Sequence, residues 1–239
     1  MEGGSDCILG NKYWVLRHGK SIPNELGLIV SSMENGILEK YGLAPAGIEQ
    51  ARSAGDSFWE ELKRNKIELE KVRICHSPFS RTSHTAQAVA SRLPSSPQLM
   101  VIDDLRERYF GPSYELMSHE KYPEIWALDE GDPFARPDNG GGESVADVVS
   151  RLANALTTIE SAFQGCAVLI VSHGDPLQIL QTVLKHSIKV EAAAKESSYD
   201  DRNHNLASRV HAAFTAAAPS VLSHHRMFSL QTGELRAIP

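Results

Sequence analysis

A regular alternation of short apolar runs with longer amphipathic segments constrains the fold of this chain more than any other feature. Four runs are rich in apolar, β-branched or aromatic side chains, which is typical of buried strands. They are Tyr13 to Leu16, Val72 to Cys75, Met100 to Ile102 and Ala167 to Ser172. Helical patterns lie between them. The sequence therefore predicts an α/β fold, a three-layer sandwich with a mostly parallel central sheet flanked by helices.

The clearest helical pattern runs from Glu143 to Phe163 and ends before Gly165, a predicted stop signal. Its apolar side chains recur at helical spacing on one face. They are Val145, Val148, Val149, Leu152, Leu156, Ile159 and Phe163. A second helix is expected from about Pro45 to Leu62, because a proline near a helix start loses no hydrogen bond. Its inward-facing residues are expected to be Ile48, Ala51, Phe58 and Leu62.

Shorter patterns complete the predicted elements. Helices are expected over Ser80 to Leu93 and Pro176 to Leu184, and His225 to Leu230 is a candidate edge strand. Residues 106–142 break the alternation with glycine, proline and aromatic side chains, so we interpret them as a small cap inserted over the sheet. The stretch from Glu107 to Glu143 holds nine acidic and three basic residues, which makes the expected cap acidic. A single domain over residues 1–239 is expected, since α/β domains often reach this size.

Composition excludes several classes of partner. The net charge of -6 argues against nucleic acid, because a duplex-binding protein needs a concentrated basic face. No apolar run approaches the roughly 20 residues that span a bilayer, so no membrane association is expected. The three cysteines lack metal-ligand spacing, which favours a reducing compartment. The first eleven residues resemble no secretory or transit signal, so we expect a cytoplasmic protein, although a leader removed beforehand would leave no trace. The oligomeric state is left open.

Polar residues suited to phosphate chemistry follow three of the predicted strands. His18 comes just after the first strand, and His173 comes directly after the last of the four apolar runs. In parallel α/β sheets ligands bind beyond the carboxyl ends of strands, so both histidines are well placed. Arg81 falls on the first turn of the helix that follows another strand. Helix N-termini attract anions, and a guanidinium adds a planar fork of donors that suits phosphate.

Each of these residues alone also has an ordinary structural interpretation. A lone histidine after a strand is more often a turn or core residue, and an arginine on an opening helical turn is usually a solvated charge. The combination is more informative. Arg17, His18, Arg81 and His173 stand at the ends of separate strands and would converge into one cationic pocket. Such a cluster repels itself unless an anion is bound.

Several blocks of sequence extend this pattern in a fixed order. They are Arg17-His18-Gly19 with Ser21 and Asn24, Leu43 to Ala51, Ser77-Pro78 with Arg81-Thr82 and Thr85-Ala86, Leu105-Arg106-Glu107, Gly142-Glu143-Ser144, and Ser172-His173-Gly174. Over roughly residues 12–185 the chain resembles the histidine phosphatase superfamily, also called the phosphoglycerate mutase-like family. Residues 185–239 match less clearly. Their histidines are expected to have surface or structural roles, namely His204, His211, His224 and His225.

The resemblance implies a role for each matching residue. His18 corresponds to the nucleophile that takes the phosphoryl group, and His173 to a second histidine that binds and stabilises it. Arg17 and Arg81 resemble the arginines that clamp the phosphate. At the pocket edge, Asn24 matches a further phosphate contact, while Glu107 matches the general acid that protonates the leaving oxygen. No metal ion and no cofactor are implied.

Elementary chemistry agrees with these roles. A neutral imidazole is a good nucleophile near pH 7, and arginines neutralise the charge of the phosphoryl group. An alcohol leaving group needs a proton, so the pKa of Glu107 should be raised. Glu107 could instead be a surface ion-pair residue, because Arg106 and Arg108 lie beside it.

Two other acids are left outside the predicted catalytic set. Glu143 could be a first-turn acid that interacts favourably with the helix dipole, and Ser144 could cap that helix. Asp175 could orient the pocket or close a turn before Pro176.

The leading functional hypothesis is a metal-independent phosphomonoesterase that hydrolyses a small phosphorylated metabolite through a phosphohistidine intermediate. A phosphoglycerate mutase is the first alternative. Such mutases usually have a tryptophan before the asparagine, whereas Pro23 precedes Asn24 here, and a mutase cap would need basic residues. A catalytically dead scaffold that binds a phosphorylated ligand is the second alternative. Dead members are expected to lack the histidine, an arginine or the acid, and all of them are present here.

Overall fold

A five-stranded sheet forms the centre of the protein in the computed structural model, which describes residues 9–195 and 219–238. Its strands are β1 (Lys12–Arg17), β2 (Val72–His76), β3 (Gln98–Val101), β4 (Ala167–Ser172) and β5 (Leu235–Ala237). The strand order is β3-β2-β4-β1-β5, and only β5 runs antiparallel to its neighbour. The predicted mostly parallel α/β sheet is therefore confirmed, and its four apolar runs are β1 to β4, with small shifts in their ends.

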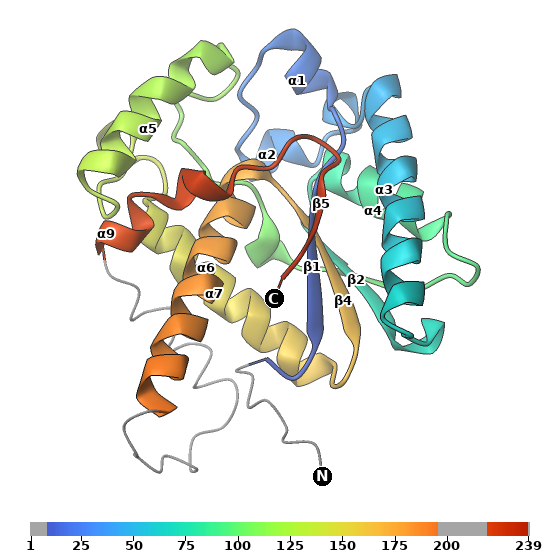
Figure 1. The fold of residues 1–239 in the computed structure, drawn as a ribbon. Coiled ribbons are helices and arrows are strands. Elements are labelled where there is room, and N and C mark those ends of the chain that lie inside the picture. Colours follow the sequence, from blue (N-terminus) through green and yellow to red (C-terminus); the bar gives the residue numbers. More distant parts are fainter. Residues whose placement is uncertain (1–8, 196–218, 239) are drawn as a thin grey trace.

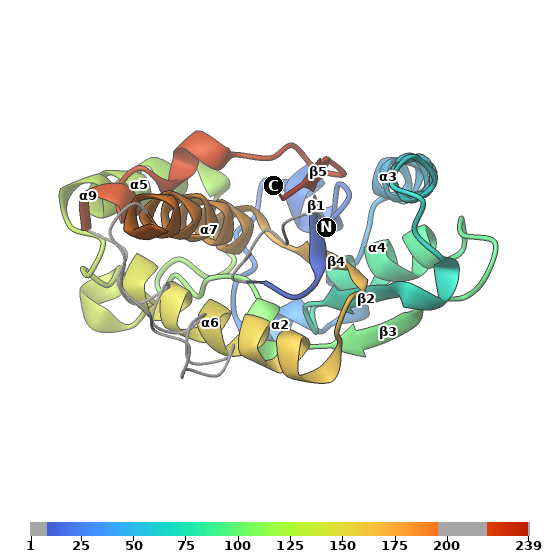
Figure 2. The same ribbon diagram turned by 60° about the horizontal axis from the view of Figure 1, so that its bottom comes forward.

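Helices cover both faces of this sheet, as Figures 1 and 2 show. The α-helices are α1 (Ile22–Leu26), α2 (Met33–Gly36), α3 (Pro45–Arg64), α4 (Ser80–Ala90), α5 (Tyr122–Gly131), α6 (Val145–Ala162), α7 (Gly174–Lys195) and α9 (Pro219–Leu222). Side chains of β1 alternate between the faces. Tyr13 and Val15 pack in the core with α6 and α7, whereas Trp14 and Leu16 pack with α3 and α4. This alternation produces the three predicted layers.

The helix α6 closely follows its sequence prediction. All seven apolar residues predicted for its inner face are buried. Ser144 caps the helix, since its hydroxyl accepts a hydrogen bond from the backbone of Asp147 at 3.0 Å. Past the end of the helix, Gly165 adopts a left-handed backbone with φ of 63°. Glycine is suited to that conformation because it has no side chain to clash.

Two local predictions are wrong. Ile48 of α3 is 37% exposed, because Gly47 rather than Ile48 faces inward in the first turn of the helix. Gly47 packs directly against the backbone there, since an added Cβ would lie 2.0 Å from the carbonyl oxygen of Lys20. The segment predicted as an edge strand instead begins with the 3-10 helix η6 (His225–Phe228). Backbone carbonyl groups of this segment accept hydrogen bonds from side chains rather than from a neighbouring strand. Gln181 donates to the carbonyl of Phe228, and Arg17 donates to the carbonyl of Leu230. The edge strand next to β1 is β5.

Residues 106–142, here called the cap, contain α5 and two 3-10 turns, η4 (His119–Lys121) and η5 (Asp138–Gly140). Together with α1 and α2, α5 lies at the end of the sheet where β1 and β4 finish (Figure 1). Phe110 and Ile125 of the cap form a small apolar core with Ile29, against which Tyr114 and Tyr122 pack. Part of the aromatic content of the cap thus serves packing, and the cap borders the strand ends that carry the predicted site.

Candidate active site

The two predicted histidines meet because their strands are neighbours. Arg17 at the end of β1 lies opposite Ser172 at the end of β4, so His18 and His173 leave the sheet side by side. Their ring centroids are 5.3 Å apart, and both side chains are buried. Gly19 allows the chain after β1 to approach the first turn of α3 closely, since an added Cβ would lie 2.2 Å from the carbonyl oxygen of Gly47.

The hydrogen bonds of His18 fix which ring nitrogen is free to react. Its Nδ1 lies 2.7 Å from the carbonyl oxygen of Gly19, which can only accept, so Nδ1 carries the proton. Its Nε2 accepts a hydrogen bond from Nε of Arg81 at 3.1 Å. Burial, followed by the charges of Arg81 and Arg17, holds the pKa of His18 well below its usual range. The imidazole is therefore neutral near pH 7, with its lone pair on Nε2 directed toward Arg81.

His173 is held between a hydroxyl group and the same arginine. Its Nε2 lies 2.8 Å from Oγ of Ser77, and its Nδ1 accepts from Nε of Arg81 at 3.2 Å. Burial, together with Arg81 and His18, holds the pKa of His173 well below its usual range. The ring of Phe79 packs edge-on against it at 5.0 Å. The orienting role of Ser77 was not predicted from the sequence, although Ser77 lies in one of the matching blocks.

Both predicted arginines keep buried donors unpaired. Nη2 of Arg81 donates to the carbonyl of Val30 at 3.0 Å, but its buried Nη1 has no partner among the described residues. Arg17 donates from Nη1 to the carbonyl of Leu230 at 2.7 Å, and its buried Nε is likewise unpartnered there. An unpaired buried donor is costly, and an anion would satisfy it. We call Arg17, His18, Arg81 and His173 the anion cluster.

Glu107 faces the anion cluster rather than solvent. Its Oε2 lies 3.6 Å from Nη2 of Arg81 and 3.7 Å from Nδ1 of His173. Burial raises the pKa of Glu107 to about 7, although Arg81 opposes the shift. The alternative of a surface ion pair is wrong, because Glu107 is buried and its two neighbours pair elsewhere, Arg106 with Glu143 and Arg108 with other acids.

Asn24 lies at the edge of the site, and its side-chain amide oxygen accepts hydrogen bonds from Ser21. Its Oδ1 accepts from the backbone nitrogen of Ser21 at 3.1 Å and from its hydroxyl at 2.8 Å, which completes a capping box at the start of α1. No described residue accepts a hydrogen bond from its Nδ2. The amide group also lines the pocket described below, so its two donors are available to a ligand.

Glu143 lies outside the anion cluster. It accepts hydrogen bonds from Arg106 at 2.9 Å, from Arg151 at 2.9 Å and from the backbone nitrogen of Tyr109 at 3.0 Å. Although burial opposes the shift, these partners hold the pKa of Glu143 below its usual value. Glu143 precedes the cap residue Ser144, so it is not in the first turn of α6 as the sequence suggested. It connects the two ends of the cap instead.

Asp175 belongs to a second buried group that the sequence did not reveal. Arg108 makes a two-pronged contact with Asp129, at 2.7 and 2.8 Å, and reaches Asp175 at 3.2 Å. Nε2 of His225 lies 3.9 Å from Asp175 and 4.0 Å from Asp129. We call Arg108, Asp129, Asp175 and His225 the support cluster. It joins the cap, α7 and η6.

Charges in the support cluster compensate one another. Although burial opposes the shift, His225 and Arg108 hold the pKa of Asp175 below its usual range. Burial alone would lower the pKa of His225, but Asp175 and Asp129 outweigh it and raise that pKa. Ligand atoms of the two acids and His225 lie within 4.8 Å of one another, a spacing that could suit a metal ion. Arg108 already supplies positive charge to both carboxylates at that place.

A buried structural position of His225 agrees with the role expected for the four C-terminal histidines. His224 is exposed and sits within hydrogen-bond distance of the carbonyl of Ser220 at 2.8 Å. The other two, His204 and His211, lie outside the described residues. No sequence signal marked His225 as different from the others, because its partners come from distant segments.

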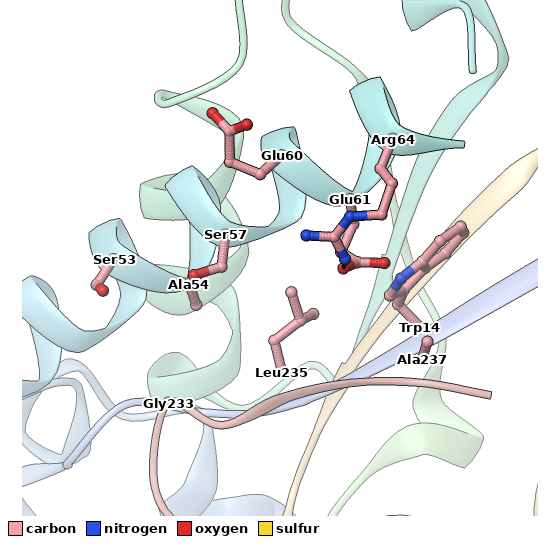
Figure 3. Close-up of a pocket in the computed structure, with 10 residues that line it drawn as sticks. All are labelled: Trp14, Ser53, Ala54, Ser57, Glu60, Glu61, Arg64, Gly233, Leu235 and Ala237. Atoms are coloured by element: carbon pink, nitrogen blue, oxygen red, sulfur yellow. Dashed lines mark hydrogen bonds and ion pairs between the residues drawn. The ribbon is translucent and has the colours of Figure 1, made fainter. Parts of the chain in front are cut away.

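A pocket of about 340 Å³ opens over the site. Arg17, Asn24 and Glu107 line it together with aromatic residues of the cap and residues of the C-terminal segment. Glu107 links this pocket to Arg81 and His173. A different groove runs between α3 and β5, where Figure 3 shows Trp14, Glu61 and Arg64. None of the predicted site residues lines that second groove, so it is not part of the candidate active site.

The fold and the site define a class: an α/β protein in which two neutral, buried histidines meet two arginines at the ends of parallel strands. Residues 13–220 match the family described as the histidine phosphatase superfamily (branch 1). The chain belongs to this family. None of the described helices is both long and apolar enough to cross a membrane.

Two relatives from Arabidopsis thaliana are similar to the chain over 169 residues each. One is a metal-independent phosphoserine phosphatase, 26% identical over 70% of this chain and 65% of its own length. The other is phosphoglycerate mutase-like protein 4, 25% identical over 70% of this chain and 67% of its own length. The chain thus spans slightly less than two thirds of the first relative.

Solved structures share the fold. A mycobacterial glucosyl-3-phosphoglycerate phosphatase in complex with VO3 superposes with a TM-score of 0.56 at 23% identity, covering 73% of this chain and 80% of that one. A phosphoserine phosphatase from Entamoeba histolytica in complex with 3-phosphoglyceric acid gives a TM-score of 0.54 at 22% identity, with the same coverage of 73% and 80%.

Proposed function

We propose that this protein is a metal-independent phosphomonoesterase that hydrolyses a small phosphorylated metabolite through a phosphohistidine on His18. The observation that carries the proposal is the pairing of a neutral His18, whose Nε2 lone pair faces Arg81, with buried guanidinium donors that lack partners. Transfer of a phosphoryl group to a side chain requires a nucleophile in contact with donors that can neutralise the phosphoryl oxygens.

In the first step, the substrate phosphoryl group binds to Arg17, Arg81 and His173, displacing the hydrogen bond from Arg81 to His18. The lone pair of Nε2 attacks phosphorus, and the bond from phosphorus to the ester oxygen breaks. Protonated Glu107 gives its proton to that oxygen, so the alcohol leaves neutral. A pKa of about 7 keeps part of Glu107 protonated near neutral pH.

In the second step, water attacks the phosphorus of phosphohistidine. Glu107, now a carboxylate, accepts a proton from this water. The bond between phosphorus and nitrogen breaks, its electron pair returns to Nε2, and inorganic phosphate is released. The carboxyl group of Glu107 is protonated again, ready for another cycle. The arginines stabilise the charge of the transferring group in both steps.

Names of relatives support a phosphatase more than a mutase. One of the two Arabidopsis relatives and the two solved structures described above are named phosphatases, and the other Arabidopsis relative is named mutase-like. Hydrolysis and mutase transfer differ in whether the phosphohistidine passes its group to water or to another substrate hydroxyl. With phosphoglycerate as substrate, a phosphatase releases inorganic phosphate, whereas a mutase produces the isomeric phosphoglycerate. Measuring both products distinguishes the two activities.

We further propose that the enzyme works in the cytoplasm and that residues 1–239 form one domain with the cap. Cys75 and Cys166 are buried and free, which fits a reducing compartment. The cap packs on residues of the sheet domain, such as Ile29, and shares the support cluster with α7.

The test is phosphate release from p-nitrophenyl phosphate by purified protein in EDTA. Acid quench during turnover of a labelled substrate should trap an acid-labile, base-stable adduct, and peptide mapping should locate it on His18. Activity that requires added Mg²⁺ or Zn²⁺, or an adduct on another residue, would overturn the proposal. Phosphate release without any trapped adduct in rapid quench would refute the two-step route.

A further inference from the structure

One of the two arginines that line the pocket has no role in the proposed chemistry. Arg226 belongs to η6 and lines the pocket together with Trp126 and Tyr122. Figure 1 shows the C-terminal segment, in red, passing close to α5 and the upper end of α7. Arg226 therefore reaches the pocket from a segment that begins more than seventy residues after the end of the cap in sequence.

A row of aromatic rings in contact with one another supports the guanidinium of Arg226. Its Cζ lies 3.6 Å from the centroid of the Trp126 ring. Trp126 stacks on Tyr122 at 5.7 Å with 7° between the planes, and Tyr122 meets Phe110 edge-on at 5.5 Å. Phe110 is buried in the small core of the cap. A guanidinium stacked on a ring keeps the N–H donors at its edge free for a ligand.

The guanidinium of Arg226 has no acidic partner in the described part of the chain. Among the residues that the structure describes, no side chain or backbone group forms an ion pair or hydrogen bond with its guanidinium, although the cap is rich in acids. Two acids line the same pocket, but both are engaged. Glu107 faces Arg81, and Asp175 faces Arg108. A fixed and exposed donor fork in a pocket wall is suited to an anion on the ligand.

We propose that Arg226 is the specificity residue of this pocket and that it selects phosphate esters carrying a second anionic group, a carboxylate or a second phosphate. This inference rests on the proposed function, because the anion cluster takes the phosphoryl group and leaves Arg226 for the remainder of the substrate. Glu107, the proposed donor to the ester oxygen, contacts Arg81 and lines the same pocket as Arg226. The pocket of about 340 Å³ suits a small metabolite.

Matched pairs of ligands test the inference by competition against p-nitrophenyl phosphate. O-Phosphoserine and O-phosphoethanolamine differ by one carboxylate, and propanediol bisphosphate and monophosphate differ by one phosphate. Wild-type protein should bind the more anionic member of a pair about tenfold to a hundredfold more tightly, as expected for a charge-assisted contact. Whichever pair shows the larger ratio identifies the second anion.

Variants connect this ratio to Arg226. Arg226→Ala should reduce the ratio to nearly one by weakening only the more anionic ligand, and Arg226→Lys should give an intermediate ratio because it keeps the charge but not the planar fork. Met227→Ala is the matched control. Met227 is the adjacent residue, is 78% exposed and does not line the pocket, so this variant should keep the wild-type ratio.

Failure of this inference and failure of the proposed function give different results. Protein that hydrolyses p-nitrophenyl phosphate but shows equal binding within both pairs, or an unchanged ratio in Arg226→Ala, refutes the role of Arg226 alone. Protein that does not hydrolyse p-nitrophenyl phosphate refutes the proposed function. Calorimetric titration of the same ligand pairs into wild type and Arg226→Ala then still measures the ratio and decides the inference.

Discussion

Two clusters of charged side chains adjoin each other at the strand ends. The positive charges of one are paired with carboxylates, whereas those of the other are largely unpaired. In the support cluster, Arg108 contacts two carboxylates and His225 lies near the same pair. In the anion cluster, Arg17 and Arg81 have buried donors without described partners, and among the described acids only Glu107 lies within 4 Å of Arg81. The clusters are linked through neighbouring residues, Glu107 with Arg108.

The difference distinguishes a structural arrangement from a binding site. A buried charge with matched partners holds segments together, and removing one partner leaves the other uncompensated. A buried cation without partners lowers stability until a ligand neutralises it. The comparison therefore predicts that changes in the anion cluster affect activity and anion binding, whereas changes in the support cluster affect folding.

The largest expected effect is on catalysis, from His18→Ala. This variant should fold normally and lose at least about a thousandfold in turnover, because its imidazole is the nucleophile and contributes little to the core. Circular dichroism and thermal unfolding should match wild type. A well-folded variant with near-wild-type phosphatase activity would contradict the assignment of His18.

Glu107→Gln should give a smaller and selective defect. Turnover of an alkyl phosphate should fall about 10²- to 10⁴-fold, because its alkoxide needs a proton, while p-nitrophenolate leaves readily without one. Since the pKa of Glu107 is raised to about 7, wild-type activity on the alkyl ester should decline above that pH, and this decline should disappear in the variant. Equal slowing of phosphoenzyme formation on both substrates would make Glu107 a positioning residue.

Arg108→Ala should break the support cluster and lower the free energy of unfolding by about 3–5 kcal/mol, because Asp129 and Asp175 would stay buried without their counter-ion. Urea unfolding measures this loss. The matched variant is Arg81→Ala, which removes an arginine that is also buried but that faces Glu107 alone among the described acids.

In Arg81→Ala the stability loss should be smaller, and binding of phosphate or vanadate should be weakened. Wild type, but not this variant, should gain about 2.7 kcal/mol of stability when phosphate is present at a hundred times its Kd. Equal stability losses in the two variants, with phosphate stabilisation intact in Arg81→Ala, would remove the distinction between the clusters.

The smallest effect concerns pH. Because the pKa of His225 is raised in the folded protein by Asp175 and Asp129, against the opposing effect of burial, its protonated form stabilises the fold. That contribution is complete below the unfolded pKa of about 6.5 and is lost as pH rises through the higher folded value. The difference in unfolding free energy between wild type and His225→Gln should therefore shrink as the pH rises above about 6.5 and through the raised folded pKa. A constant difference across this range would show that His225 is not charged in the fold.

The sequence alone determined the local features. Apolar runs and helical periodicity predicted four strands and the inner face of α6, because these patterns depend on near neighbours. Strand ends followed by His18, His173 and Arg81 predicted where a phosphate site would be, because parallel strands place their carboxyl ends at one edge. The short strand β5 and the 3-10 helix η6 were not predicted, since three or four residues carry too little pattern.

Only the tertiary structure decided which charges are paired. Whether Glu107 faces solvent or the histidines depends on partners that Arg106 and Arg108 find far along the chain. The support cluster draws on the cap, α7 and η6, and Arg226 meets Trp126 from equally distant segments. Burial and the field of neighbouring charges set a pKa, and both arise from contacts between segments that no local sequence pattern encodes.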